Sequence, residues 1–119
     1  MKYVVITGSS GLVGSEAVDF FIKKKFKVIA IDNNMRRYFF GKNADTNWQK
    51  KIQKKKFNKK VLQLNIDIRN HNKIKKIFSN YREKIKCIIH AAAQPSHDWA
   101  YKEPLTDFNI NATSTLNLL

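Results

Sequence analysis

Three of the chain's four glycines fall within seven positions near the N-terminus. Residues Thr7 to Gly14 read TGSSGLVG and directly follow an apolar run. In a loop between a strand and a helix, glycines allow a tight turn, a close approach of an anion, and close packing of the helix on the strand. The helix N-terminus adds free N–H groups and the positive end of its dipole. This spacing predicts a loop that binds pyrophosphate; the alternative is an ordinary strand-to-helix turn.

An acidic residue follows the glycine loop at the distance expected for ribose recognition. Asp32 lies eighteen residues after Gly14, at the end of the apolar run Val28–Ile31. A carboxylate there can accept hydrogen bonds from both ribose hydroxyls and would repel a 2′-phosphate. We therefore predict NAD as the cofactor, while Arg36 and Arg37 keep NADP as the alternative.

Two further strand ends could contact a dinucleotide. Asp67 is predicted to end the third strand and could accept from the adenine amine, although an acid there could equally cap the next helix. Residues His90 to Ala93 read HAAA, and such small side chains let a ring or a ribose lie against the backbone. We interpret His90 as a hydrogen-bonded core histidine rather than as a ligand or a base.

The predicted strands are four short apolar runs: Val4–Ile6, Val28–Ile31, Val61–Ile68 and Cys87–Ala92. Segments with helical spacing lie between them. Such alternation predicts an α/β fold with a parallel sheet and right-handed crossovers. Because a complete dinucleotide-binding sheet has about six strands, we expect a partial, doubly wound sheet of the Rossmann type with about four.

Apolar stripes predict the inward faces of three helices. The clearest pattern spans Asn70 to Tyr81, where Asn70 is placed to cap the helix. The first helix is expected to bury Val13, Ala17, Phe20 and Phe21. The segment from Leu105 to Leu119 is expected to bury Phe108, Ala112, Thr115, Leu116 and Leu119.

The chain is strongly basic. Lys and Arg total 23 against nine Asp and Glu, a net charge of +14, and only four of the cations are Arg. The segment Asn33 to Lys60 holds eight Lys and one acid, together with the aromatic cluster Tyr38–Phe40 and a short helix carrying Trp48 and Ile52. Because base and phosphate recognition relies on the bidentate Arg fork, we interpret the Lys as a solvated surface and expect no nucleic-acid partner. A polyanion-binding patch is the alternative.

Length and composition set further limits. The 119 residues suffice for one small domain. No apolar stretch approaches the ~20 residues of a membrane span, and the N-terminal run is too short for a signal peptide, so we expect a cytoplasmic chain without a membrane partner. The single cysteine, Cys87, excludes an internal disulfide and is expected to be buried and inert. No metal site is predicted.

Together, these motifs resemble the extended short-chain dehydrogenase/reductase family of nucleotide-sugar epimerases and dehydratases. The glycine loop, Asp32-Asn33, Asp67-Ile68, the HAAA strand end and the final string NATSTLNLL follow that family's order over the whole chain. Three loop strings, IDNNMR, YFFG and AAQPSHDWA, are most similar to those of the CDP-paratose (CDP-tyvelose) 2-epimerases.

The resemblance implies a cofactor site and a reaction. The residues that would line NAD are Gly8, Ser10, Gly11, Leu12, Val13, Gly14, Asp32, Asn33, Asp67, Ile68, Ala91, Ala92, Gln94 and Asn111. Ser96 and His97 would border the sugar. The implied reaction oxidises a sugar carbon transiently with NAD and re-reduces it from its opposite face. The family's base is a Tyr helped by a Lys four residues later; we expect that pair beyond Leu119, and no catalytic residue in this chain.

We therefore expect residues 1–119 to form the N-terminal part of an NAD-binding domain, with the catalytic segment and the substrate domain outside this chain. The whole protein would be an NAD-dependent nucleotide-sugar epimerase, with a CDP-sugar favoured as substrate and a homo-oligomeric assembly. The chain alone would be inactive. The alternatives are a 4,6-dehydratase or another epimerase of the same family, and a non-catalytic NAD-binding module.

Overall fold

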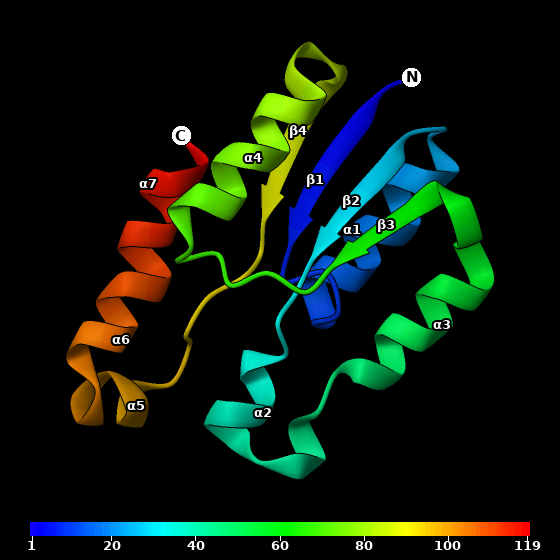
Figure 1. Cartoon of the computed structure of the whole chain (residues 1–119). Coiled ribbons are helices and arrows are strands. Elements are labelled where there is room, and N and C mark those ends of the chain that lie inside the picture. The colour runs from blue at the N-terminus through cyan, green and yellow to red at the C-terminus, as the bar shows by residue number, and fades with distance from the viewer.

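The computed structural model describes residues 1–119, in which strands and helices alternate along the chain (Figure 1). The strands are β1 (Tyr3–Thr7), β2 (Lys27–Ile31), β3 (Val61–Leu64) and β4 (Ile85–His90). The helices are α1 (Leu12–Lys23), α2 (Met35–Phe40), α3 (Asn47–Phe57), α4 (His71–Tyr81), α5 (His97–Lys102), α6 (Pro104–Phe108) and α7 (Ser114–Leu118). A π-helical turn, Asn109–Thr113, joins α6 to α7. None of the helices is long and apolar enough to cross a membrane.

The four strands form one parallel sheet in the order β3-β2-β1-β4. At its centre, Val5 of β1 lies opposite Ile29 of β2 and Ile88 of β4. Because every connection returns to the same end of the sheet, all four carboxyl ends lie at one edge (Figure 1). The predicted α/β fold with a partial Rossmann-type sheet is confirmed.

Side chains of β1 alternate between two apolar cores, one on each face of the sheet. Val4 and Ile6 pack with Val18 of α1. Val5 belongs to the other core, which includes Ile74 of α4. Burial on both faces is typical of a parallel sheet covered by helices, and it explains why the strands read as continuous apolar runs.

Helix α4 follows its prediction, whereas α1 follows it in part: Ala17 and Phe21 are half-buried against the core, as expected. The Asn70 side chain accepts a 3.1 Å hydrogen bond from the backbone nitrogen of Lys73 and so caps α4. The buried residues of α1 are Gly14, Val18 and Ile22. Val13 and Phe20, expected inside, are 66% and 53% exposed. Gly14 sets this orientation, because a Cβ added there would lie 1.9 Å from a carbonyl oxygen of the glycine loop.

The C-terminal helical segment also buries a different stripe from the one predicted. Ile110, Ser114 and Leu118 are buried, whereas Phe108 and Leu116 are exposed. The π-helical turn adds one residue to a helical turn. It therefore changes which residues of α7 lie on the same side as the apolar residues of α6. Ile110 and Leu118 thereby join the core beside α4.

Two expectations about the outer strands were wrong. Strand β3 ends at Leu64 rather than Ile68, because its neighbour β2 ends at Ile31, directly opposite Leu64. Asp67 therefore lies in the loop after β3 and not at the strand's end. Cys87 is exposed rather than buried, since β4 is an edge strand.

Candidate cofactor site

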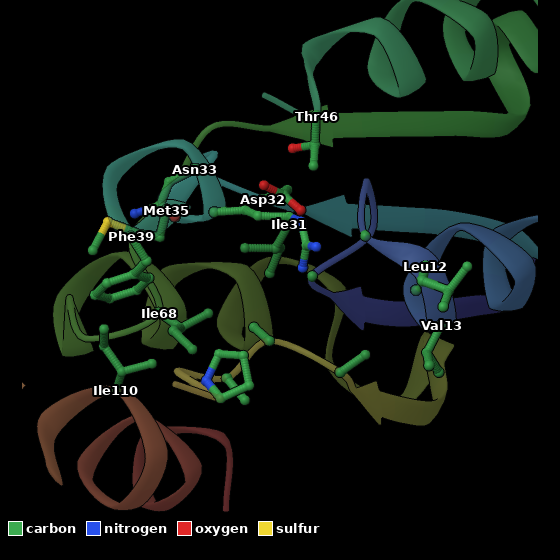
Figure 2. A pocket seen from close by; sticks show the side chains of 18 of the residues that line it. Leu12, Val13, Ile31, Asp32, Asn33, Met35, Phe39, Thr46, Ile68 and Ile110 are labelled. Atoms are coloured by element: carbon green, nitrogen blue, oxygen red, sulfur yellow. The ribbon is translucent and has the colours of Figure 1, made fainter. Parts of the chain in front are cut away.

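A cavity of about 250 Å³ opens at the carboxyl ends of the strands. This is the edge at which open α/β sheets bind ligands. Figure 2 shows Asp32 and Asn33 beside it, with Thr46 on one side and Ile68 and Ile110 on the other. The residues predicted to hold NAD that line it are Gly8, Gly11, Leu12, Val13, Gly14, Asp32, Asn33, Asp67, Ile68, Ala91 and Ala92.

The glycine loop places backbone groups where an anion can reach them. Gly8 has a φ of +66°, and a Cβ there would lie 2.8 Å from the backbone nitrogen of Ala92, so the loop packs directly against the end of β4. Gly11 lines the cavity and donates its N–H to Gly8 at 3.0 Å. Helix α1 then begins with neither a side-chain cap nor an acid in its first turn. Its first N–H groups are therefore available to phosphate oxygens.

Asp32 is held by two backbone donors. Its Oδ2 accepts from the nitrogen of Ser10 at 3.0 Å, and its Oδ1 accepts from the nitrogen of Asn34 at 2.7 Å. These bonds fix the carboxylate beside the glycine loop. Each oxygen keeps lone-pair capacity for a further donor, as two ribose hydroxyls would require.

Two serine hydroxyls in the loop have unmet hydrogen-bonding capacity. The Oγ atoms of Ser9 and Ser10 are buried and have no partner within the chain. Buried hydroxyls without partners are uncommon and call for an explanation. Both residues lie between Gly8 and Gly11, which line the cavity, so a phosphate group bound at the loop would lie close to these hydroxyls. The residues present therefore fit a dinucleotide. No group of His, Cys, Asp or Glu side chains is placed to hold a metal ion.

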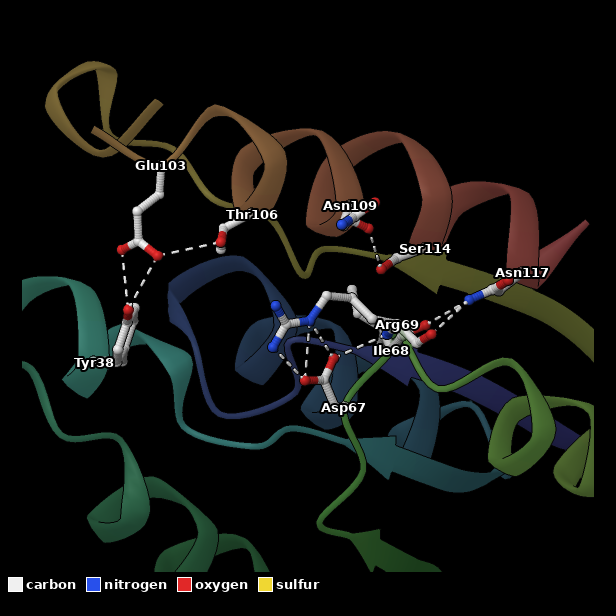
Figure 3. A network of polar contacts seen from close by, with 9 residues as sticks. All are labelled: Tyr38, Asp67, Ile68, Arg69, Glu103, Thr106, Asn109, Ser114 and Asn117. Carbon is white, nitrogen blue, oxygen red and sulfur yellow. Dashed lines mark hydrogen bonds and ion pairs between the residues drawn. The ribbon is translucent and has the colours of Figure 1, made fainter. Parts of the chain in front are cut away.

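The loop after β3 presents Asp67 to the cavity together with a cation (Figure 3). Arg69 donates from Nε to both carboxylate oxygens at 3.0 Å and from Nη2 at 2.6 Å. The hydrogen bonds from this guanidinium hold the pKa of Asp67 below its ordinary value of 3.8. Asn117 of α7 anchors the same loop by donating to the Ile68 carbonyl at 3.1 Å. The carboxylate is thus ionised and fixed, with one flank already occupied by Arg69.

His90 is hydrogen-bonded on both ring nitrogens. Nδ1 lies 2.6 Å from Oγ1 of Thr7, and Nε2 lies 3.1 Å from Oγ1 of Thr115. Burial lowers the pKa of His90 below 6.5, which favours the neutral ring. Its interpretation as a hydrogen-bonded histidine is confirmed, but the residue is half-buried and belongs to neither apolar core.

Five of the predicted site residues lie outside the cavity lining: Ser10, Gln94, Asn111, Ser96 and His97. Gln94 and Asn111 bond to each other instead: Gln94 N donates to Asn111 Oδ1 at 2.8 Å, and Asn111 Nδ2 donates to Gln94 O at 3.0 Å. Ser96 caps α5 by accepting from the nitrogen of Trp99, and His97 is exposed. Their contacts with cofactor or sugar stay predictions.

Several cavity residues were not predicted from the sequence: Met35, Arg36, Phe39, Phe40, Thr46, Pro95 and Ile110. Phe39 is held by Trp99 of α5, whose Nε1 donates to the Phe39 carbonyl at 2.6 Å. The two rings also pack edge to face. Sixty positions separate this pair in the chain, so no local spacing could have indicated it.

Comparison with known proteins identifies the family. Residues 5–119 match the family described as GDP-mannose 4,6 dehydratase. The chain belongs to this family. The predicted membership of the epimerase and dehydratase family is therefore confirmed.

The similar proteins of known activity act on different nucleotide sugars. UDP-glucuronate 4-epimerase of Thermodesulfobacterium geofontis is 33% identical over all of this chain and 35% of its own length. CDP-paratose 2-epimerase of Salmonella typhi is 29% identical over 98% of this chain and 31% of its own. UDP-glucose 4-epimerase of Bifidobacterium longum, solved in complex with NAD+ and UDP, shares the fold with a TM-score of 0.77 and 21% identity, over 98% of this chain and 32% of its own. The chain thus spans about a third of each relative's length.

One Tyr and one Lys of this chain have the spacing of the family's catalytic Tyr and Lys. Tyr38 is followed four residues later by Lys42. The Tyr38 hydroxyl donates to the Glu103 carboxylate at 3.0 and 3.3 Å, and this bond raises the pKa of Tyr38 above 10.0. A phenol acting as a base near neutral pH needs the opposite shift. Tyr38 also lies outside the cavity lining, so neither its pKa nor its position supports a catalytic role for the pair.

Proposed function

We propose that this chain forms the NAD-binding part of a nucleotide-sugar epimerase. The observation that carries the proposal is the junction of the glycine loop with Asp32, in which Ser10 N donates to the carboxylate beside a cavity at the strand ends. This junction places phosphate donors and a ribose acceptor next to each other. Homology to epimerases over the whole chain supports the same assignment.

The residues divide the binding task among them. The proposed NAD-lining set is Gly8, Ser10, Gly11, Leu12, Val13, Gly14, Asp32, Asn33, Asp67, Ile68, Ala91, Ala92, Gln94 and Asn111. The glycine loop and the first turn of α1 bind the pyrophosphate, and Asp32 binds the adenosine ribose. Asp67 accepts from the adenine amine. Bound NAD supplies a reversible hydride acceptor, and the protein holds it against the sugar carbon.

The catalytic Tyr and Lys and the sugar-binding residues belong, in this proposal, to a part of the protein outside residues 1–119. Matching relatives are about three times longer than the chain, which supports this division. Ser96 and His97 are the residues of this chain proposed to border the sugar.

For the substrate, we propose a CDP-sugar and 2-epimerisation. The loop strings after β2 and β4, including Arg36 and the segment Pro95–Ala100, support this choice by their similarity to CDP-paratose 2-epimerases. A UDP-sugar is the second candidate, because a UDP-glucuronate 4-epimerase is 33% identical to this chain.

The substrate assignment can be tested on the natural protein saturated with NAD+. CDP-paratose, CDP-tyvelose, UDP-glucose and UDP-glucuronate are each incubated with it, and the products are followed by proton NMR. The proposal predicts interconversion of the two CDP-sugars. Epimerisation of the UDP-sugars alone would replace it with the second candidate, and no epimerisation of any of the four would contradict both.

A further inference from the structure

Along most of its length, helix α3 buries a polar side chain and exposes its apolar ones. Gln53 is 2% exposed and is the buried residue of this helix. Trp48 and Ile52, one turn apart, are 61% and 49% exposed. A surface helix normally packs an apolar stripe on the core. Among the apolar residues of α3, Phe57 at its C-terminal end packs against a core. The docking of the rest of the helix depends on polar contacts.

Those polar contacts come from one face of α3 and its N-cap, at positions 46, 50 and 53. Thr46 donates from its backbone nitrogen and its hydroxyl to Oδ1 of Asn34, at 3.0 and 3.1 Å. Lys50 Nζ donates to the carbonyl of Asp32 at 2.7 Å. Spacings of four and three residues bring these side chains to the same side of a helix.

Gln53 makes the contact that reaches deepest. Its Nε2 donates to the carbonyl of Ser9 at 2.8 Å, inside the glycine loop. Its Oε1 accepts from Nε2 of Gln63 on β3 at 3.3 Å, and the same Gln63 nitrogen donates to the Lys50 carbonyl at 2.8 Å. The Gln53 amide thus uses both its donor and its acceptor side, and it links the loop after β1 to strand β3.

The contacts of α3 end within the two segments that supply the proposed NAD site. Ser9 is inside the glycine loop, and Asp32 and Asn34 form the turn after β2. We propose that α3 is a brace for the cofactor site, in which Gln53 positions the glycine loop and Lys50 positions the Asp32 turn. Both are positioning residues that act through backbone carbonyls, and neither lines the cavity. The inference rests on the proposed NAD site for its consequence, but the brace itself can be observed without cofactor.

The first experiment measures the brace in the ligand-free natural protein. Amide hydrogen exchange is followed by NMR at Gly11, whose N–H bonds to Gly8 within the loop. Gln53→Met removes the bond to Ser9, and we expect exchange at Gly11 to accelerate about tenfold while the amide of Val5 in β1 keeps its rate. Gln49→Met is the matched control, because the half-buried Gln49 side chain has no hydrogen bond. Unchanged exchange at Gly11 would overturn the brace.

The second experiment measures NAD+ affinity as a function of pH in Gln53→Glu. An ionised carboxylate cannot donate to the Ser9 carbonyl, whereas a protonated carboxyl can, and burial raises the pKa of the introduced group. At about pH 8 we expect the NAD+ dissociation constant of the variant to be about tenfold higher than that of the wild type. At about pH 5.5 the two dissociation constants should differ less. A loss of affinity that is the same at both pH values would overturn the positioning role.

The two measurements separate the brace from the proposed function. If the wild type fails to bind NAD+, the proposed function is wrong, and the exchange rate of Gly11 in Gln53→Met still decides the brace. If the wild type binds NAD+ and Gln53→Met changes neither the exchange at Gly11 nor the affinity, the brace alone is wrong.

Discussion

The backbone nitrogen of Ser10 donates to Oδ2 of Asp32 across 3.0 Å, joining the loop after β1 to the residue that follows β2. The bond links the two parts of the proposed dinucleotide site within the protein itself. It leaves the second oxygen to the nitrogen of Asn34, so the carboxylate is oriented before any ligand arrives. Such preorganisation reduces the entropy lost when a ligand binds.

Substitution of the glycines should separate stability from binding. Gly14→Ala places a Cβ 1.9 Å from the Gly8 carbonyl oxygen, and we expect the free energy of unfolding to fall by about 3 kcal/mol, measured in urea. Gly11→Ala meets its nearest atom at 3.3 Å, so it should cost under about 1 kcal/mol. Because Gly11 lines the cavity, NAD+ affinity should nevertheless fall. Equal stability losses in the two variants would contradict the packing role of Gly14.

The stability of the fold should depend on His90 between neutral and mildly acidic pH. Burial lowers the pKa of His90 below 6.5 in the folded state, so the unfolded chain binds the proton more readily. The stabilising effect is present above 6.5 and is lost as pH falls through the folded-state pKa. We expect a smaller pH dependence of urea unfolding in His90→Gln than in the wild type. The exposed His97→Gln variant is the control, and identical slopes in both variants would refute the effect.

Arg69 should control the titration of Asp67. Its hydrogen bonds hold the pKa of Asp67 below 3.8, so Arg69→Met should raise that pKa, as read from the Asp67 carboxyl carbon by NMR. The corresponding stability is present above 3.8 and is lost as pH falls below it. Arg82→Met is the control: it removes an exposed cation that makes no contact with Asp67, so the titration of Asp67 should stay unchanged. If the pKa of Asp67 is the same in Arg69→Met as in the wild type, the proposed effect of the ion pair is wrong.

The indole of Trp99 should stabilise the segment that carries Phe39. Trp99→Phe keeps an aromatic ring but removes the 2.6 Å bond from Nε1 to the Phe39 carbonyl, and we expect a loss of about 1 kcal/mol in urea unfolding. Trp48→Phe is the matched control, since Trp48 is exposed and makes no hydrogen bond. Equal effects of the two substitutions would show that the bond contributes nothing.

Much of the fold could be predicted because its signals are local. The glycine loop, the Asn70 cap and the four apolar strands each depend on residues within a few positions of one another. The buried face of α1 could not be read from apolar residues alone, because a glycine, Gly14, makes its closest contact. The C-terminal stripe was missed because the π-helical turn Asn109–Thr113 changes the helical repeat.

The remainder of the candidate site depends on contacts between distant segments. Thr46 and Phe39 come from the insertion between β2 and β3, and only the folded chain brings them to the cavity. Gln53 was hidden within a run of Lys that we interpreted as a solvated surface. Its buried amide meets Ser9, 44 positions away, and sequence spacing cannot show such a pairing.

The most direct test of the account is a calorimetric titration of NAD+ into the natural protein and two variants. We predict saturable binding at one site in the wild type, and a loss of about 1 to 3 kcal/mol of binding free energy in Asp32→Ala. Glu16→Ala, which removes an exposed acid from α1, should bind as the wild type does. An unchanged affinity in Asp32→Ala, or no binding by a wild-type protein shown to be folded, would contradict the NAD site.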